Sequence, residues 1–446
     1  MRHQSTFSYE EEDRKETEQK LIEDDSEDYK RLARNAIENW DADSIIITTA
    51  VQFFESVYSN RRSKLRKLHN MADSILVFDE AHLMPKEYLQ PCLQGIVYLT
   101  RYCNSEAIFL TATMPDFRQL MEKYALKGQR ICNLIEDTSS FSVFRKCHYR
   151  FVGELSEEEL IQRAKQFPSS LIIANSRKKV RDIYCLCTGK KFHLSTYMTP
   201  CDREVALENI RKELAQLELD FPDGENVPPE RRITIVSTSL IEAGVDLDMY
   251  AVFRELDGLD SILQAGGRCN REGKRSGAEV FIFELPQNSR ADQDGRRSIT
   301  KGILQEYEDI SMPECIRDYY GRLLGLNHEK LIQNTLSRQC SHIANIPFRS
   351  YAESFKVIDS KHQSLIVPRD DRCRELVWKL QTEGSRMETS RQLQRYACSI
   401  YQSELDDLIR QHVVQDYGTG IYCLTNPDYY DNEIGIIFEA SDYFME

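Results

Sequence analysis

Residues 75–84 read ILVFDEAHLM, and this stretch decides the fold. Its first four residues are apolar and predict a strand that ends directly in two carboxylates, Asp79 and Glu80. A parallel strand that ends in paired acids is typical of nucleotide hydrolases, which use the acids to hold Mg²⁺ and to position water. Such enzymes also need a glycine-rich loop that cradles the phosphates. The first glycine of this sequence is Gly95, so the stretch predicts only half of a nucleotide site.

Apolar runs alternate with helical patterns on both sides of this stretch. Helices with apolar spacing of three and four are predicted over residues 52–60, 87–102 and 202–219. Strands and helices in alternation predict a parallel α/β sheet, and the restart of the pattern near residue 150 predicts a second such unit. The predicted strands cover residues 44–49, 74–80, 107–113, 170–176, 192–196, 232–239, 250–255 and 279–285.

Other segments have a different character. Residues 8–32 are crowded with charge, which predicts a solvated helix or a disordered lead-in. Residues 221–232 predict a turn-rich surface loop, and residues 291–345 look helical and polar. Beyond residue 350 we expect a third, smaller module that mixes helices and short strands. Its predicted helix covers residues 389–412, and its predicted strands cover 420–425 and 435–440.

Bulk composition narrows the class of protein. A length of 446 residues suggests two to three domains, and an apolar content of 41% is ordinary for a globular chain. The sequence has no run of roughly 18 apolar residues and no signal-peptide pattern, so no membrane partner is predicted. The 13 cysteines include no Cys-x-x-Cys pair, which argues against disulfides and structural zinc and favours a reducing cytoplasm. The net charge of −14 counts against DNA binding, but only weakly, because the total charge does not show whether one groove is locally basic.

Four segments agree in order and spacing with a set of helicase motifs. Together they resemble motifs II, III, V and VI of superfamily 2 helicases. The segments are DEAH at 79–82, TAT at 111–113, STSLIEAGVDLD at 237–248 and QAGGRCNR at 264–271.

The chemistry of ATP hydrolysis suggests a role for each charged residue of these motifs. Asp79 would hold Mg²⁺ through its water shell, and Glu80 would orient the attacking water of an ATP hydrolase. Arg268 and Arg271 are three residues apart, so on a helix they would share one face and could both reach the γ-phosphate. Arginine suits this role because its planar fork binds phosphate oxygens bidentately. A surface face of ordinary salt bridges is the alternative. The predicted cofactors are ATP and Mg²⁺.

The remaining motif residues predict supporting roles. His82 could bridge the two α/β units, while Thr111 and Thr113 could couple the nucleotide site to a nucleic-acid groove. Gly244 would permit close approach of the backbone. Thr238, Glu242, Gly244 and Asp246 lie in the segment where such motors contact both the strand backbone and the nucleotide. We expect nucleotide contacts from His82, Gly244, Asp246 and Gln264, and a nucleic-acid contact from Thr238.

Polar residues at two other strand ends predict phosphate contacts. Thr48, Thr49 and Gln52 lie at the end of the first predicted strand, and Asn175, Ser176 and Arg177 at the end of another. A polar strand terminus without a binding role explains both groups equally well.

The flanking residues narrow the resemblance. Residues 40–93 look like the signature helicase–nuclease of type I CRISPR interference, closest to its type I-C branch. TATMP, HLSTYMTPCDRE, STSLIEAGVDLD and DSILQAGGRCNREG are similar to its later motifs, and LQRYACSIYQSELDD and GIYCLTNPDYYD to its tail. The resemblance implies a 3′-to-5′ single-stranded DNA translocase, recruited by an RNA-guided surveillance complex. It also implies a nuclease domain with a His-Asp metal site and a C-terminal domain that closes over the DNA channel.

On this resemblance we predict an α/β fold with two RecA-like parallel-sheet helicase domains and a smaller mixed C-terminal domain. The first RecA-like domain is expected to be truncated at its N-terminus. The predicted boundaries are 1–145 and 146–290 for the two RecA-like domains, 291–349 for a helical linker, and 350–446 for the C-terminal domain.

The sequence departs from the family in two ways, since it has neither a His-Asp dipeptide nor a Gly-x-x-x-x-Gly-Lys-Ser/Thr loop. We therefore expect a C-terminal part of the family's protein without the nuclease domain and the phosphate loop. Three explanations stay open: a separate polypeptide supplies the missing part, the gene is broken or started late, or the chain works without catalysis. The rivals to a DNA translocase are a non-enzymatic module that binds DNA or the effector complex, and an RNA helicase of another pathway.

Overall fold

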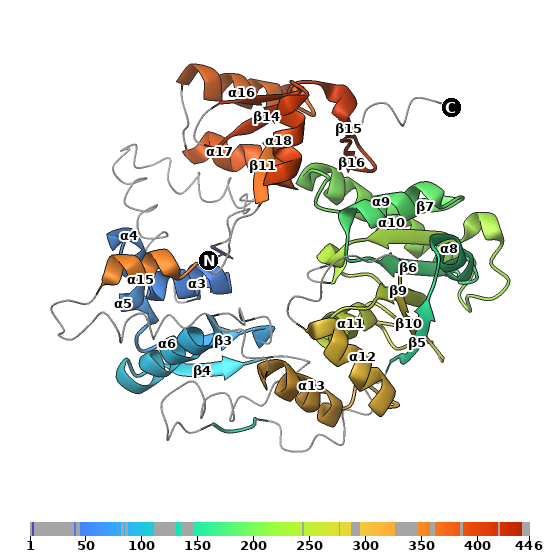
Figure 1. Ribbon diagram of the computed structural model, residues 1–446, viewed down its shortest axis with the longest axis horizontal. Helices are drawn as coiled ribbons and strands as arrows, with labels where there is room; N and C mark the ends of the chain where they lie inside the picture. Colours follow the sequence, from blue (N-terminus) through green and yellow to red (C-terminus); the bar gives the residue numbers. More distant parts are fainter. Residues whose placement is uncertain are drawn as a thin grey trace. The chain divides into compact units, whose positions relative to one another are not determined.

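The computed structural model divides the chain into two compact units (Figure 1), which we describe separately. Unit 1 comprises residues 1–134 and 324–359, and unit 2 comprises residues 135–323 and 360–446. The structure describes residues 2–3, 40–41, 45–81, 84, 88–110, 131–134, 146–242, 245–275, 277–286, 295–325, 347–356, 362–383, 387–417 and 420–438.

Unit 1 contains two pairs of parallel strands among its described residues. Strand β1 pairs with β2, and β3 pairs with β4 so that Phe78 lies opposite Phe109. The predicted strand ILVF is confirmed, whereas the predicted strand at 44–49 is reduced to two residues. The described elements are β1 (Arg2–His3), β2 (Ile47–Thr48), α3 (Ala50–Val57), α4 (Arg62–Leu65), α5 (Lys67–Met71), β3 (Ile75–Phe78), α6 (Leu89–Tyr102), β4 (Glu106–Phe109) and α15 (Phe348–Ser354).

One face of the β3–β4 sheet carries the core of unit 1. Leu76 and Phe78 pack against buried residues of α3 and α6, and the Phe78 ring stacks on Phe109 with centroids 5.5 Å apart. The alternate residues of β3 point the other way, so Ile75 is 65% exposed and Val77 is 56% exposed. Parallel strands are usually covered on both faces, and here the described residues cover only one.

Unit 2 is built on a six-stranded, wholly parallel sheet with the order β5-β10-β9-β6-β8-β7. Its described elements up to residue 325 are β5 (His148–Glu154), α8 (Glu157–Ala164), β6 (Ser169–Ile173), α9 (Arg177–Leu186), β7 (Lys190–Leu194), α10 (Pro200–Asp220), η4 (Pro229–Arg231), β8 (Ile233–Ser237), η5 (Ser239–Ile241), β9 (Ala251–Glu255), α11 (Leu259–Gly266), β10 (Glu279–Glu284), α12 (Arg296–Glu306) and α13 (Pro313–Gly325).

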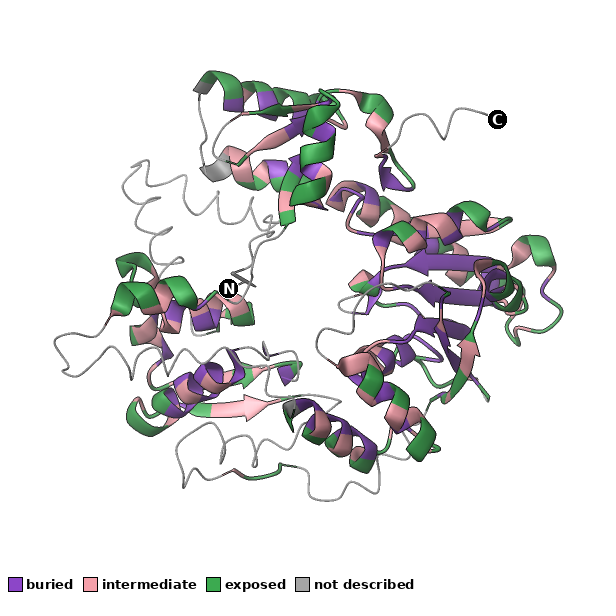
Figure 2. Ribbon diagram, viewed as in Figure 1, coloured by how far each residue is buried: buried purple, intermediate pink, exposed green. Residues whose placement is uncertain are grey.

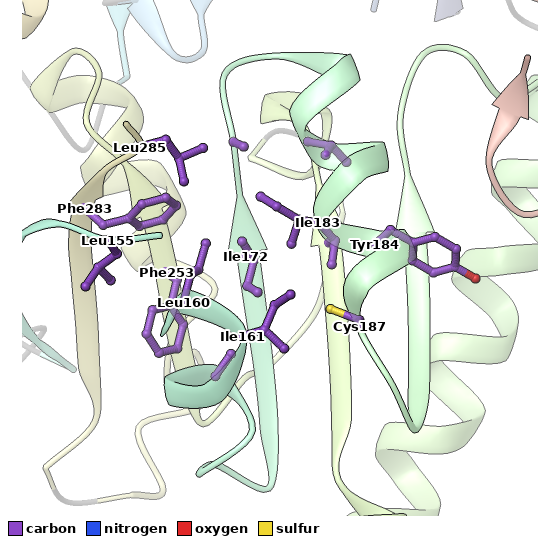
Figure 3. Packing of buried hydrophobic residues seen from close by; sticks show 14 of the residues in the cluster. Leu155, Leu160, Ile161, Ile172, Ile183, Tyr184, Cys187, Phe253, Phe283 and Leu285 are labelled. Atoms are coloured by element: carbon purple, nitrogen blue, oxygen red, sulfur yellow. The ribbon is translucent and has the colours of Figure 1, made fainter. Parts of the chain in front are cut away.

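Helices cover both faces of this sheet. Every residue of β6, β8 and β9 is buried, which is why these strands read as unbroken apolar runs (Figure 2). Ile172 and Phe253 pack with Leu160 of α8 and Ile183 of α9 on one face (Figure 3). Residues of α10 and α11 pack on the opposite face. The capping box of Ser156 starts α8 next to this core.

The edge strand β5 escaped the sequence analysis. Its burial pattern alternates irregularly, and it pairs with β10 on one side only. A partly polar edge strand gives a weak periodic signal, so the segment showed no strand pattern of its own.

The C-terminal part of unit 2 forms a mixed four-stranded sheet with the order β12-β11-β14-β13. The helix predicted over 389–412 is wrong in its middle, because β12 interrupts it and pairs antiparallel with β11. Cys398 and Ile400 are both buried there, and burial of every second residue is the period of a strand. The described elements are β11 (His362–Ile366), α16 (Asp371–Glu383), α17 (Met387–Leu393), η7 (Gln394–Tyr396), β12 (Ala397–Tyr401), α18 (Gln402–Arg410), β13 (Val414–Asp416), β14 (Tyr422–Leu424), η8 (Pro427–Tyr429), β15 (Tyr430–Asp431) and β16 (Gly435–Ile436).

The two sheets of unit 2 are joined by specific contacts. The Arg177 guanidinium lies between the rings of Tyr197 and Tyr401, 4.3 and 4.2 Å from their centroids, and donates to the Ser399 carbonyl at 2.5 Å. The predicted domain boundaries stay a prediction. Among the helices that the structure describes, none has the length and apolarity to traverse a bilayer.

Candidate functional site

The acid pair of unit 1 lies where the sequence placed it, directly after β3. Asp79 and Glu80 are both exposed, and the Glu80 amide donates to Asp79 Oδ1 at 3.0 Å. Glu80 has a φ of 49°, which is uncommon for a residue with a side chain and is typical of functional turns. The amide of Ala81 then donates to the Leu110 carbonyl at 3.1 Å. The turn thus presents two carboxylates at the carboxyl end of the sheet.

The polar residues at and after the end of β2 differ in their hydrogen bonds. The Thr49 hydroxyl caps α3, since it accepts from the Gln52 amide at 3.2 Å. The Thr48 hydroxyl is buried and has no hydrogen-bond partner among the described residues. Thr49 therefore has a structural task, and Thr48 and Gln52 stay predictions for phosphate contact. Four other predicted site residues lie outside the described part of the chain: His82, Thr111, Thr113 and Gly244.

Three strands of unit 2 end side by side. Ile173 at the end of β6 lies opposite Ser237 of β8 and opposite Arg254 of β9. Because the strands are parallel, the segments that follow them emerge at one edge of the sheet. Asn175 and Thr238, which the sequence assigned to nucleic-acid contact, are both placed at this edge.

A fully buried arginine connects these segments. Arg254 has no exposed surface, and its Nε lies 2.8 Å from Glu242 Oε1. Its terminal nitrogens donate to Asn175 Oδ1 at 2.6 Å, to Asp257 Oδ2 at 3.0 Å and to Ser261 Oγ at 2.8 Å. Ser261 Oγ in turn donates to Glu242 Oε2 at 2.7 Å. We call these five residues the arginine hub, which ties together the ends of β6 and β9, the segment after β8, and α11.

The hub also determines what Asn175 can do. Its backbone amide donates to Glu255 Oε2 at 2.6 Å, and its side-chain amide donates to the Leu256 carbonyl at 3.0 Å. With Arg254 on its oxygen, the side chain is held inside the protein, so its arrangement favours positioning over direct phosphate contact. Burial raises the pKa of Glu242 and of Glu255, although Arg254 lowers the first of these pKa values and the Asn175 amide the second.

Arg268 and Arg271 do not share a helix face, which corrects the sequence-based geometry. Helix α11 ends at Gly266, and Asn270 has a φ of 50°, so the chain turns between the two arginines. Arg268 is buried and donates to the carbonyls of Ile241 at 3.2 Å and of Glu242 at 2.6 Å.

Arg271, in contrast, has a 43% exposed side chain, and its Nε lies 2.6 Å from Asp246 Oδ1. The Asp246 side chain is 75% exposed, so this ion pair faces solvent. Arg271 is accessible to a ligand, whereas Arg268 holds the segment after β8 in place. The predicted residues Gln264, on α11, and Ser176, before α9, are both half-buried.

The sequence analysis missed the hub, and it offered Arg177 as a phosphate contact, whereas the structure buries this side chain against the rings of Tyr197 and Tyr401. One signal was present, since Arg254 interrupts the apolar strand AVFRE, and a charge at a buried position needs partners. Its partners lie 3 to 79 residues away along the chain, so no local pattern identifies them. Among the described residues, no group of three or more His, Cys, Asp or Glu side chains is arranged to hold a metal ion.

Comparison with known proteins finds similarity to CRISPR-associated helicases. The model of the family "CRISPR-associated nuclease/helicase Cas3, C-terminal" matches residues 168–274, which contain the arginine hub and both arginines of the last motif. The curated CRISPR-associated nuclease/helicase Cas3 of Haloferax volcanii is 25% identical, in a match that covers 54% of this chain and 35% of that protein.

Solved structures show the same fold. The crystal structure of T. fusca Cas3 with ATP matches with a TM-score of 0.54 and 14% identity, covering 85% of this chain and 54% of that one. A chain of a CRISPR RNA-guided surveillance complex in a pre-nicking state matches with a TM-score of 0.55 and 13% identity, covering 91% of this chain and 61% of that one. This chain therefore spans between about a third and three fifths of the length of these proteins.

These matches agree with the α/β architecture. The predicted fold class, with RecA-like parallel-sheet domains, is confirmed. Over residues 168–274 the chain is similar to the C-terminal part of the CRISPR-associated helicase Cas3.

Proposed function

We propose that this chain is the motor part of an ATP-dependent translocase that moves 3′ to 5′ along single-stranded DNA in type I CRISPR interference, an antiviral defence. The observation that carries the proposal is the exposed acid pair Asp79–Glu80 at the carboxyl end of β3. In this proposal Asp79 holds Mg²⁺ through its water shell, and Glu80 orients the attacking water. A relative solved with ATP supports the choice of nucleotide.

The residues present fit these ligands in part. Carboxylate oxygens are the ligands that Mg²⁺ prefers, and both acids are accessible. When bound, ATP supplies free energy through hydrolysis of its terminal phosphate. Arg271 is exposed and is the better candidate to contact that phosphate, while Arg268 acts as a positioning residue through the carbonyls it holds. The sequence contains no glycine-rich loop that would cradle the phosphates.

The proposal therefore includes a partner polypeptide that carries such a loop and the nuclease domain. The exposed face of β3, with Ile75 and Val77 uncovered by the described residues, supports a further segment against this sheet. An RNA-guided surveillance complex is the proposed recruiting partner, because one similar chain was solved in such a complex. Single-stranded DNA is the proposed track, with Thr48, Gln52, Ser176 and Thr238 as candidate contacts.

A non-enzymatic module is the second candidate. It is favoured by the absence of Gly-x-x-x-x-Gly-Lys-Ser/Thr from the sequence. Such a module would bind DNA or the effector complex through the same units without turnover, and its binding would be indifferent to ATP.

The test compares Glu80→Gln with the unaltered chain. We would measure DNA-stimulated phosphate release by each chain after mixing with a polypeptide that carries a glycine-rich phosphate loop. Glu106→Gln is the matched control, because Glu106 is exposed at the opposite end of the same two-stranded sheet. We expect Glu80→Gln to lower turnover by at least ~100-fold and Glu106→Gln to leave it unchanged.

Equal turnover by the Glu80→Gln and unaltered chains would refute the catalytic assignment. If no mixture turns over ATP, and DNA affinity is the same with and without ATP in both chains, the non-enzymatic module is the better account. ATP-dependent release from DNA would count against that module.

A further inference from the structure

A strongly basic segment stands out in this acidic chain. Between Glu55 and Asp73 there is no acidic residue, although the whole chain has a net charge of −14. Within residues 59–69, SNRRSKLRKLH, five side chains are cationic at neutral pH. They are Arg61, Arg62, Lys64, Arg66 and Lys67.

Two of these five cations are used inside the fold. Lys64 Nζ lies 2.8 Å from Glu55 Oε2, an ion pair that ties α4 to α3. Lys67 is buried, and its Nζ lies 5.1 Å from the centre of the Trp40 ring. Both contacts fix the backbone of the basic segment. They leave three cations for another task.

The other three cations form what we call the arginine patch, Arg61, Arg62 and Arg66. All three are exposed, and the structure gives their guanidinium groups no ion pair or hydrogen bond with any described residue. Of the twelve other exposed arginines in the described chain, six pair with a carboxylate, as Arg150 does with Glu279 at 2.7 Å. Neighbouring guanidinium groups without counter-charges repel one another, so a bound polyanion would reduce this electrostatic repulsion.

The backbone sets the spacing of the patch. The Arg66 amide donates to the Arg62 carbonyl at 3.2 Å, and the Leu65 amide donates to the Arg61 carbonyl at 3.0 Å. Arg62 and Arg66 are thus one helical turn apart on one face, which puts their Cβ atoms about 5–6 Å from each other. The patch is a short row of charges on a fixed frame.

We propose that the arginine patch binds the phosphate backbone of single-stranded nucleic acid, and this proposal rests on the proposed translocase function. Guanidinium groups bind phosphate oxygens bidentately and stay charged at every physiological pH. The segment has little apolar surface for a protein interface, since Leu65, 38% exposed, is its one large exposed hydrophobic residue.

The same surface predicts how the strand is bound. Two aromatic side chains of the described chain lie beside the basic segment. Tyr58 is half-buried, and its hydroxyl donates to the Pro91 carbonyl at 2.5 Å, while Trp40 is buried against Lys67. Neither offers an open ring on which a base could stack. Contacts at the patch are therefore with phosphates and independent of sequence, and they depend strongly on salt.

The test measures binding of a fluorescein-labelled oligodeoxythymidine by anisotropy, without nucleotide, over a salt titration. The full chain is compared with a triple variant that carries Arg61→Gln, Arg62→Gln and Arg66→Gln. Three phosphate contacts account for a slope of about −2 in the plot of log affinity against log salt. We expect the triple variant to lose that slope, and to lose affinity on the order of 100-fold at 0.05 M salt.

A second triple variant keeps the change in charge the same. It carries Arg150→Gln, Arg374→Gln and Arg410→Gln, three exposed arginines that pair with acids within unit 2. We expect it to bind within about twofold of the unaltered chain, with a slope reduced by less than about 0.5. Circular dichroism of both variants checks that the fold is retained.

Equal slopes for the patch variant and the unaltered chain would overturn the proposal, as would an equal loss in the control variant. Polyglutamate of the same charge is the competing probe. If it binds as tightly as the oligonucleotide and also loses affinity in the patch variant, the partner is an acidic polypeptide and the proposal fails. Because the assay contains no ATP, its outcome is independent of the Glu80→Gln result that decides the proposed function.

Discussion

Replacement of Arg254 by methionine is the most informative test of unit 2. The guanidinium is fully buried, and it lies within 3.0 Å of oxygens of Glu242, Asp257, Asn175 and Ser261. Methionine keeps much of the length and fills part of the space, so the main effect is the loss of charge and donors. The Glu242 carboxylate, with a side chain only 7% exposed, would be left without its cation.

The expected cost follows from that arrangement. Removal of one partner from a buried ion pair costs about 3–5 kcal/mol, because the other charge stays buried and uncompensated. We therefore expect Arg254→Met to lower the free energy of unfolding by about 4 kcal/mol, a large share of the ~5–15 kcal/mol typical of a folded protein. The assay is urea unfolding of the full chain followed by far-ultraviolet circular dichroism.

Two further variants make the test specific. Arg150→Met removes an arginine whose side chain is 65% exposed and that pairs with Glu279 at 2.7 Å, and it should cost less than about 1 kcal/mol. Adding Glu242→Gln to Arg254→Met removes the uncompensated charge, so the double variant should be more stable than the sum of the single losses predicts. If Arg254→Met costs no more than Arg150→Met, or if the two hub substitutions are additive, the reasoning about the hub is refuted.

Three other predictions concern unit 2. Burial lowers the pKa of His193 to about 4, so between pH 6.5 and pH 4 the unfolded chain binds more protons than the folded chain. The free energy of unfolding should therefore fall by about 3 kcal/mol as the pH drops through this window. His193→Gln should flatten this part of the plot of urea midpoint against pH. Gly435 has a φ of 82°, and a Cβ there would lie 2.7 Å or less from the backbone of residues 197–198. Gly435→Ala should therefore lower the free energy of unfolding by at least ~2 kcal/mol, measured by thermal unfolding. A loss under ~0.5 kcal/mol would contradict the geometry. Arg268→Ala should lower the free energy of unfolding by about 2 kcal/mol and Arg271→Ala by less than about 0.5 kcal/mol; equal losses would mean that the two side chains have similar surroundings.

Much of the fold follows from local pattern. The central strands of unit 2 are buried on both faces, so continuous apolar runs identify them directly. The position of Asp79 and Glu80 follows in the same way, because a side chain directly after a strand lies at that strand's end. The edge strand β5 and the strand β12 were missed, since their apolar residues are interrupted by polar ones or sit inside a helix-like pattern.

The sequence by itself thus determined the α/β class, the strand-end acids and the order of the helicase-like motifs, since each of these depends on neighbours along the chain. Only the tertiary structure decided that Arg268 faces inward while Arg271 faces solvent, because a left-handed turn at Asn270 ends the helical spacing. It also decided that Asn175 binds Arg254, and that three arginines of one basic segment have no partner in the described part of the chain while its lysines do. These outcomes depend on which distant groups meet in three dimensions. A buried charge takes whatever partner the fold brings within about 3 Å, and sequence distance carries no information about that choice.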